Sequence, residues 1–201
     1  MIQSLSVGPM DNNAYLLTCP GTGEKLLVDA AAEPARLLDL IGDGGLSAVV
    51  TTHRHDDHLG ALAAVLAATG ADSWAGEPDA AAIAEAAGVP LPRPLRHGDH
   101  LAVGSLDLEV IALRGHTPGS IALAFTDPAD GAVHLITGDS LFPGGPGKTH
   151  TPAEFRSLMT DLEDRVFGRF DDRTVVHPGH GLPSTLGAER GSIPAWWARG
   201  W

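Results

Sequence analysis

Short apolar runs bounded by glycine and proline alternate with helical patterns along the chain. Residues 14–18 and 25–29 flank a Pro-Gly-Thr-Gly turn and are predicted to form a β-hairpin. Helical patterning follows over residues 34–41, and the apolar run 46–52 is predicted to be a buried strand. An Ala- and Leu-rich segment over 57–68, which stops just before a glycine, predicts a second helix.

The second half of the chain shows the same alternation of strand and helix patterns. Thr151, Pro152 and Glu154 form a helix start, with a capping threonine, a proline at the first helical position and a glutamate three residues after the cap. This helix is expected to run to about Phe167. The other predicted elements are a helix over 79–87 and strands within 101–113, 120–126, 133–138 and 173–177. Two strand-rich halves with helices outside predict two packed sheets, covered by helices on both outer faces.

Composition predicts a single globular domain over residues 1–201. Hydrophobic residues make up 43% of the chain and charged residues 19%, which is typical of a chain that buries a core. The net charge of -12 argues against nucleic-acid binding, because phosphate neutralisation needs clustered lysine and arginine. The single cysteine, Cys19, excludes an intramolecular disulfide and a multi-cysteine metal cage.

The sequence predicts neither a signal peptide nor a membrane span. The N-terminus has no signal-peptide pattern, and the longest apolar stretch, residues 60–70, is too short to span a bilayer, so we expect a cytoplasmic protein that does not bind membranes. Near the C-terminus, Trp196, Trp197 and Trp201 are expected to pack against the core, with an interface or the rim of a substrate pocket as the alternatives. The sequence contains no signal for oligomeric state.

The histidines are concentrated in one segment. Three of the ten histidines and two aspartates lie within six residues, 53–58, directly after a predicted strand. His53 and His55 can project the same way, because alternate residues of an extended chain share a face. Asp57 and His58 fall at the predicted helix start and are aimed at a neighbouring point. The segment therefore offers two ligands to each of two ions, and imidazole with carboxylate suits zinc, iron or manganese. A loop that merely caps a helix would not need this composition.

Four ligands from one segment predict partners elsewhere in the chain. His116, Asp139 and His180 each follow a predicted strand and each stands next to a glycine. Glycine lets the backbone approach a crowded site closely. These three residues are therefore the expected remaining ligands.

The ordered motifs resemble the metallo-β-lactamase-fold superfamily and, within it, the glyoxalase II-like (hydroxyacylglutathione hydrolase-like) branch. The resemblance rests on Asp29 after a strand, on the His-x-His-x-Asp-His cluster at 53–58, and on the Gly-His-Thr-Pro-Gly-Ser, Gly-Asp-Ser-Leu-Phe and Pro-Gly-His-Gly motifs. It implies an α+β fold, a four-layer αββα sandwich with the site at one edge of the sheets. The C-terminal helical domain of full-length glyoxalase II has no counterpart in this sequence.

The resemblance also implies how the ligands are shared between two divalent metal ions, with zinc expected and iron or manganese as alternatives. The sets are His53, His55 and His116 for one ion, Asp57, His58 and His180 for the other, and Asp139 as the bridge. Asp29 would hold the cluster through hydrogen bonds. His177, close to the last motif, is expected to be structural.

The implied activity is hydrolysis of a small-molecule thioester such as an S-acyl-glutathione. A hydroxide held between the two ions would attack the carbonyl carbon, with Asp57 orienting it. Lys148 matches a lysine that contacts glutathione in glyoxalase II, whereas His150 and Leu182 stand where that family has substrate tyrosines. Glutathione itself is therefore not implied as firmly as the chemistry.

Other functions on the same fold stay open. A mononuclear iron persulfide dioxygenase would need only the first histidine set and Asp139. A lactonase usually has a tyrosine near the site, and the only tyrosine here is Tyr15 in the first hairpin. A non-catalytic module is disfavoured because every ligand is present, and a nuclease is disfavoured by the negative charge.

Overall fold

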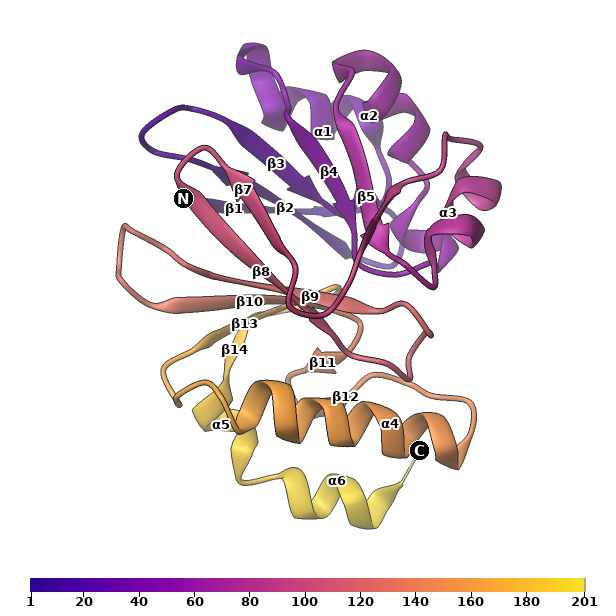
Figure 1. Cartoon of the computed structure of the whole chain (residues 1–201), viewed down its shortest axis with the longest axis vertical. Coiled ribbons are helices and arrows are strands. Elements are labelled where there is room, and N and C mark those ends of the chain that lie inside the picture. The colour runs from indigo at the N-terminus through magenta and orange to yellow at the C-terminus, as the bar shows by residue number, and fades with distance from the viewer. Residues whose placement is uncertain (201) are drawn as a thin grey trace.

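The computed structural model describes residues 1–200 and has two six-stranded sheets packed face to face (Figure 1). The first sheet, in spatial order, contains β1 (Ile2–Val7), β2 (Asn12–Thr18), β3 (Lys25–Val28), β4 (Ala48–Thr51), β5 (Asp72–Gly76) and β6 (Arg93–Leu95). Strands β1 to β3 pair antiparallel, and β3 to β6 pair parallel. The parallel strands all run toward the same edge, which is where ligand-bearing loops leave an α/β sheet.

The second sheet has the order β14-β13-β10-β9-β8-β7. Its strands are β7 (His100–Val103), β8 (Leu106–Ala112), β9 (Ile121–Thr126), β10 (Val133–Gly138), β13 (Val175–Pro178) and β14 (Ser184–Thr185). Only β10 and β13 pair parallel, so both end at the same edge of the sheet. A small hairpin of β11 (Leu141–Phe142) and β12 (Gly145–Pro146) follows β10.

Helices cover both outer faces of the pair of sheets (Figure 1). The first sheet is covered by α1 (Pro34–Ile41), α2 (Leu62–Thr69) and α3 (Ala80–Ala87), and the second by α4 (Pro152–Leu162), α5 (Leu186–Arg190) and α6 (Ile193–Arg199). Three apolar layers result: one under α1 to α3, one between the sheets, and one under α4 to α6. The predicted four-layer αββα sandwich is therefore confirmed.

Most predicted elements are present, but the helix predicted over 57–68 is wrong in its first half. Residues Asp56–His58 form a single 3₁₀ turn, and α2 begins only at Leu62. Gly60 separates the two because the chain passes so close to Ala31 that a Cβ at this position would lie 2.7 Å from its carbonyl oxygen. Asp57 and His58 therefore sit on a tight turn and not on a regular helix.

Six strands were not predicted: β1, β5 and β6 of the first sheet, and the two-residue strands β11, β12 and β14. The helix start at Thr151 is as predicted: its side chain accepts a hydrogen bond from the Glu154 amide, and the helical turns continue to Phe167. Trp196 is buried in the apolar layer formed with α4, as expected for core packing, and Trp197 is partly exposed, while Trp201 lies outside the described residues. None of the helices within residues 1–200 is both long and apolar enough to cross a bilayer.

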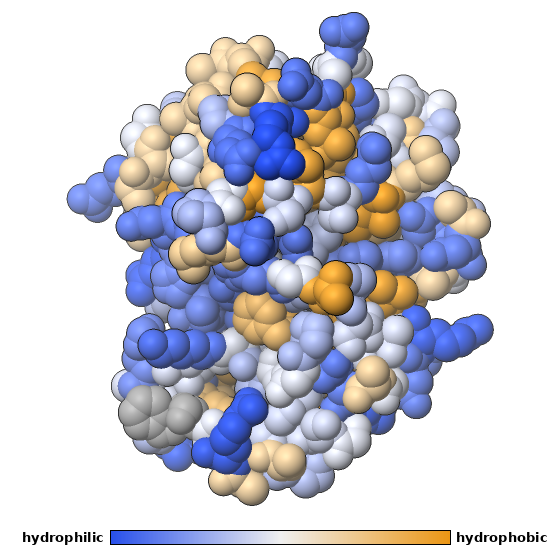
Figure 2. Space-filling view, turned by 180° about the vertical axis from the view of Figure 1, so that it is seen from behind, coloured by the Kyte–Doolittle hydropathy of each residue, from blue (hydrophilic) through white to orange (hydrophobic). Residues whose placement is uncertain are grey.

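The surface seen from behind is mainly polar, with apolar groups emerging in the upper half and at mid-height (Figure 2). Cys19 is buried in the layer between the two sheets and contacts Ser105.

Candidate metal centre

The predicted ligand residues come together from both sheets. The segment 53–58 follows β4 of the first sheet. His116 follows β8, Asp139 follows β10 and His180 follows β13, all in the second sheet. The fold thus brings residues more than a hundred positions apart in sequence to one site.

Three groups of side chains are close enough to hold a cation. In each group the ligand atoms lie within 4.8 Å of one another, and the groups are His53 with His55 and His116, His53 with His58 and Asp139, and Asp57 with His58 and His180. The first and third groups coincide with the two ligand sets that the family resemblance implies.

Asp139 lies between the two sets. Its Oδ1 is 3.3 Å from His58 Nε2, and its Oδ2 is 3.5 Å from His180 Nε2 and 3.7 Å from His116 Nε2. One carboxylate is thus within reach of both sides of the cluster. Asp57 is confined to one side, with its Oδ2 3.3 Å from His180 Nε2.

Four of the histidines are held from behind by their Nδ1 atoms. His53 Nδ1 donates to Thr52 Oγ1 (3.0 Å), and His58 Nδ1 donates to Asp29 Oδ2 (2.9 Å). His116 Nδ1 donates to the Lys148 carbonyl (2.7 Å), and His180 Nδ1 donates to the Met10 carbonyl (2.9 Å). A proton on Nδ1 leaves the Nε2 of a neutral imidazole as a lone pair, which is the form that binds metals. These contacts fix both the tautomer and the direction of each ring.

Three of the Nε2 atoms in this cluster have no hydrogen-bond partner within the protein. Those of His53, His58 and His116, together with Asp139 Oδ1, are buried and lack a hydrogen-bond partner. A buried polar atom without a partner costs about 1–3 kcal/mol, so several converging on one point would strongly disfavour the fold by themselves. Divalent cations would satisfy all of them, and the residues present therefore fit a metal centre.

Asp29 fixes the cluster from the first sheet. Its carboxylate, 1% exposed, accepts from the Thr52 amide (2.7 Å) and hydroxyl (2.8 Å) as well as from His58. Since the Thr52 hydroxyl also accepts from His53, one carboxylate orients two histidines. The backbone of Asp29 is in the left-handed region at a φ of 58°, a conformation that aspartate tolerates better than most residues.

Two further residues organise the centre and were not predicted. Asn12 donates from Nδ2 to Asp57 Oδ2 at 2.8 Å, which fixes the carboxylate at the mouth of the site. Asp79, fully buried, accepts from the Arg54 amide, the Thr117 hydroxyl and the Gly119 amide, and so ties the ligand loop of the first sheet to the loop of His116. In the sequence Asp79 has only the signal of a helix cap, and Asn12 has none.

Two glycines beside Asp139 leave no room for a side chain at their positions. A Cβ on Gly179 would lie 2.1 Å from Asp139 Oδ1, and one on Gly147 would lie 1.7 Å from the Asp139 carbonyl oxygen. Both oxygens belong to Asp139, so neither can move aside unless Asp139 itself moves. The expected close approach of the backbone is therefore present on two sides of this residue.

The protonation states suit cation binding. Burial lowers the pKa of His53, His55 and His116, which keeps these rings neutral. Burial also lowers the pKa of His58, but the carboxylates of Asp29 and Asp139 outweigh it and raise the value to about 10. Burial would raise the pKa of Asp139, yet the neighbouring His180 and His58 rings hold it well below its usual range. A cation bound by His58 would displace the proton that the raised pKa keeps on this ring.

The predicted substrate residues lie at the rim. Lys148 holds His116 through its carbonyl while its side chain is exposed, and the His150 amide donates to Glu154 Oε2 (3.0 Å) at the start of α4. Neither side chain has a partner among the ion pairs of the described residues. Tyr15 is turned away from the centre, because its hydroxyl donates to the Pro178 carbonyl (2.6 Å).

Comparison with known proteins agrees with this geometry. Residues 7–180 match the family model of the metallo-beta-lactamase superfamily. Hydroxyacylglutathione hydrolases from Polaromonas and Fuscovulum blasticum are 36% and 38% identical over 84% and 85% of this chain. The chain spans only 62% of the length of each of these curated relatives.

Solved structures match over nearly the whole chain. TTHA1623, crystallised in a di-iron-bound form, is 32% identical with a TM-score of 0.72, covering 96% of this chain and 100% of that one. ETHE1 from Myxococcus xanthus is 27% identical with a TM-score of 0.81, covering 96% of this chain and 83% of that one. The family match, the relatives and the assembled cluster agree, and the chain belongs to the metallo-β-lactamase superfamily.

Proposed function

We propose that this protein is a dinuclear metal-dependent hydrolase that acts on a thioester. The two sets of ligands are His53, His55 and His116 for one ion, and Asp57, His58 and His180 for the other, with Asp139 shared. Zinc is the proposed metal, and the di-iron form of the relative TTHA1623 makes iron the first alternative.

The observation that carries the proposal is the convergence of unpartnered ligand atoms. Three buried Nε2 atoms and one carboxylate oxygen of the cluster have no hydrogen-bond partner in the protein, while the Nδ1 atoms of the same rings are all bonded. Structural histidines normally use both nitrogens. Rings that are held on one side and empty on the other are what a metal site requires.

The chemistry follows from these positions. Divalent ions lower the pKa of bound water and polarise a carbonyl group. Asp57, held by Asn12 and with its side chain 26% exposed, is placed to orient the attacking water and accept its proton. The water oxygen forms a bond to the acyl carbon, the carbon–sulfur bond breaks, and the departing thiolate takes up a proton.

Two observations support a thioester as the substrate. The relatives from Polaromonas and F. blasticum bear the name hydroxyacylglutathione hydrolase. Lys148 presents an exposed cation next to His116, where it would bind the anionic carrier of such a thioester. His150 would line the same side of the site.

A mononuclear iron persulfide dioxygenase is the second candidate. The likeness to ETHE1 fits this alternative. It would use only the set of His53, His55 and His116 with Asp139. The assembled third group of Asp57, His58 and His180 favours the dinuclear hydrolase over it.

Elemental analysis together with a substrate panel tests the proposal. We expect about two metal ions per chain and hydrolysis of S-acyl-glutathione thioesters, followed as release of free thiol. One iron per chain, no thiol release and oxygen uptake with glutathione persulfide would instead establish the dioxygenase. Metal-free protein that regains hydrolysis on addition of two equivalents of Zn²⁺ would fix the stoichiometry.

A further inference from the structure

Each of the two groups of metal ligands draws on both sheets. The first ligand set is His53, His55 and His116, and the second ligand set is Asp57, His58 and His180. In each set the last histidine follows a strand of the second sheet, and the other members follow β4 of the first sheet. The geometry of each set therefore depends on how the two sheets are held together at that point.

Asp79 lies at the residue before helix α3 but does not cap the helix. An aspartate at this position usually accepts a hydrogen bond from an amide in the first helical turn. The Asp79 side chain makes no such bond, and it is fully buried. Its carboxylate is turned away from its own helix and is available to other parts of the chain.

Both loops that carry the first ligand set donate to this carboxylate. From the first sheet, the amide of Arg54, which lies between two ligand histidines, donates to Oδ2 (3.1 Å). From the second sheet, the Thr117 hydroxyl donates to Oδ2 and the Gly119 amide donates to Oδ1 (2.9 Å). Because Thr117 and Gly119 follow His116 closely, one side chain links the two parts of the first ligand set.

The two loops can meet here because two glycines leave room. A Cβ on Gly119 would lie 2.5 Å from the Asp79 amide nitrogen, and one on Gly76, the last residue of β5, would lie 2.0 Å from the Gly119 carbonyl oxygen. Both contacts are with backbone atoms, so a side chain would fit only if the loops moved apart. The close approach of Asp79 to the His116 loop is therefore favoured by the sequence of both segments.

The first ligand set also lacks a charge of its own. Its three ring centres lie 4.5 to 4.8 Å from one another, and all three ligands are imidazoles. The second ligand set, in contrast, includes the carboxylate of Asp57. Asp79 adds a buried negative charge beside the first set, and Arg54, with Nε 3.9 Å away, is 43% exposed and offsets that charge only in part.

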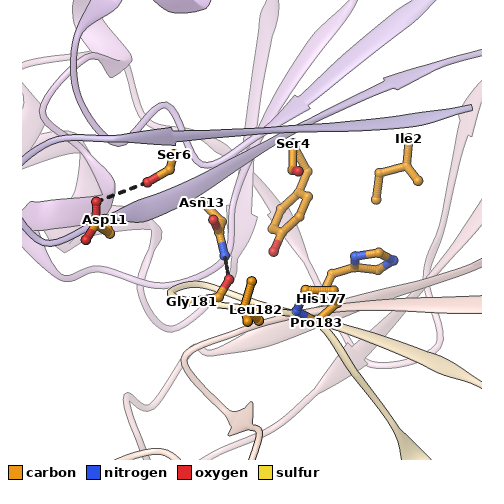
Figure 3. Close-up of a pocket in the computed structure, with 10 residues that line it drawn as sticks. Ile2, Ser4, Ser6, Asp11, Asn13, His177, Gly181, Leu182 and Pro183 are labelled. Carbon is orange, nitrogen blue, oxygen red and sulfur yellow. Dashed lines mark hydrogen bonds between the residues drawn. The ribbon is translucent and has the colours of Figure 1, made fainter.

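The second ligand set is held across the sheets by a different residue. Asn13, in β2, donates from Nδ2 to the carbonyls of Pro178 (3.1 Å) and Gly181 (2.8 Å), and Figure 3 shows the bond to Gly181. The Asn13 amide donates to the Gly179 carbonyl (2.7 Å). Three carbonyls around His180 are thus bonded to one residue of the first sheet, without any contribution from Asp79.

We propose that Asp79 is a positioning residue for the ion of the first ligand set and has no part in holding the ion of the second. It fixes the spacing between the two loops of the first set and supplies the negative charge that the three imidazoles lack. The inference rests on the proposed dinuclear centre and adds a residue that controls one of its two ions.

Zinc affinities in single-site backgrounds test the proposal without relying on turnover. His180→Ala leaves only the first ligand set complete, and His116→Ala leaves only the second. Competition with a chromophoric chelator measures the Kd for Zn²⁺ in each background. Asp79→Asn should weaken Zn²⁺ by about 10–100-fold in His180→Ala and by less than about twofold in His116→Ala. Equal weakening in both backgrounds, or none in His180→Ala, would overturn the proposal.

The matched variant Asn13→Leu should show the opposite pattern. It keeps the size of the side chain and removes the amide, so it should weaken Zn²⁺ by about three- to tenfold in His116→Ala and leave His180→Ala unchanged. The visible spectrum of bound Co²⁺ provides a second measurement, because it reports ligand geometry. Asp79→Asn should change this spectrum only in His180→Ala, and a change in both backgrounds would count against a role confined to one ion.

Asp127→Asn controls for the loss of a buried carboxylate as such. Asp127 is 4% exposed and accepts from the Ala129 amide (2.8 Å) in the turn after β9, so its removal should leave Zn²⁺ affinity unchanged in both backgrounds. A loss as large as that of Asp79→Asn would overturn the proposal. Thr117→Val removes one donor, keeps the carboxylate and should weaken Zn²⁺ by about three- to tenfold in His180→Ala alone, which keeps the proposal testable if Asp79→Asn does not fold.

Stoichiometry separates this inference from the proposed function. A wild-type protein that binds one ion, weakened by Asp79→Asn, would contradict the dinuclear hydrolase and support the role of Asp79. A protein that binds two ions and hydrolyses thioesters, with neither ion dependent on Asp79, would support the hydrolase and overturn the inference.

Discussion

Two clusters of histidines lie in this molecule, and they are built in opposite ways. In the candidate centre, Nδ1 is bonded and Nε2 has no partner. In the second cluster, on β10 and β13, His134 Nδ1 and His177 Nε2 bond each other at 2.8 Å, and His134 Nε2 lies 3.2 Å from Asp130. The second cluster also stacks, with the two rings 5.1 Å apart and nearly parallel.

The difference shows what distinguishes a metal site from a structural group of histidines. Both clusters contain buried imidazoles with a carboxylate nearby, so composition does not separate them. What separates them is whether ring nitrogens remain unpaired at one point. His134 has used both nitrogens within the protein and has no lone pair to offer to a cation.

The largest difference between the two clusters should appear in metal content and activity when one histidine is removed from each. His116→Ala should lower the metal content by about one ion per chain and kcat/KM by more than about 1000-fold, because the water activated by the centre is lost. His134→Ala should retain both ions and activity. Metal analysis and thioester assays on the two purified variants make the comparison, and loss of metal from both would erase the distinction between the clusters.

The carboxylates behind the two clusters give the next largest effect. Asp29→Asn should weaken metal affinity by about 10–100-fold, since Asp29 orients His58 directly and His53 through Thr52. Asp130→Asn makes the same change beside His134 and serves as the control. Competition with a chromophoric chelator measures both affinities, and an unchanged value for Asp29→Asn would mean that the rings hold their positions without it.

The second cluster should be visible in the dependence of stability on pH. Burial, with a contribution from His134, lowers the pKa of His177 to about 4, below the value of about 6.5 in an unfolded chain. The unfolded chain therefore binds this proton more readily, and the stabilisation present above pH 6.5 is lost as the pH falls toward 4.

Urea unfolding of the metal-free protein checks this difference. Between pH 7 and pH 4.5 the wild type should lose about 2 kcal/mol more of its free energy of unfolding than His177→Gln. His97→Gln removes an exposed imidazole and controls for the loss of a histidine as such. Parallel curves for wild type and His177→Gln would show that His177 is not the group responsible.

The smallest effect on catalysis is expected at Lys148. Lys148→Gln should raise KM for anionic thioesters about three- to tenfold and change kcat less than twofold, because an exposed cation contributes to binding and not to the reaction. Arg156→Gln, an exposed cation on α4, is the matched control. If KM for anionic substrates does not change, Lys148 is a solvated loop lysine.

Much of the fold could be predicted because the strands that build the core carry long apolar runs. The hairpin of β2 and β3, the strand before His53 and the capped α4 all follow from local pattern. Strands β1, β5 and β6 carry no such run: β1 alternates with exposed serines, β5 contains aspartate and glycine, and β6 contains a proline. These segments are extended because they pair with neighbouring strands, and such tertiary contacts are not visible in the local sequence.

The same limit applies to the site. The ligand candidates were found because histidine and aspartate cluster after strands and match ordered family motifs. Asn12 and Asp79 were missed because each acts through a contact with a distant segment, Asp57 in one case and the His116 loop in the other. The partition of the ligands between two ions, and the roles of Lys148 and His150, stay predictions.

The origin of the ligands in both sheets has a consequence for folding. Cys19 is the single cysteine and is free, so no disulfide cross-links the first half of the chain to the second. An ion held by His53 and His116, or by His58 and His180, would act as a removable cross-link between the two halves. Metal concentration would then set the apparent stability, as free ligand does for any site formed only in the native state. In a metal-poor cell such a protein would lose its activity and its resistance to proteolysis together.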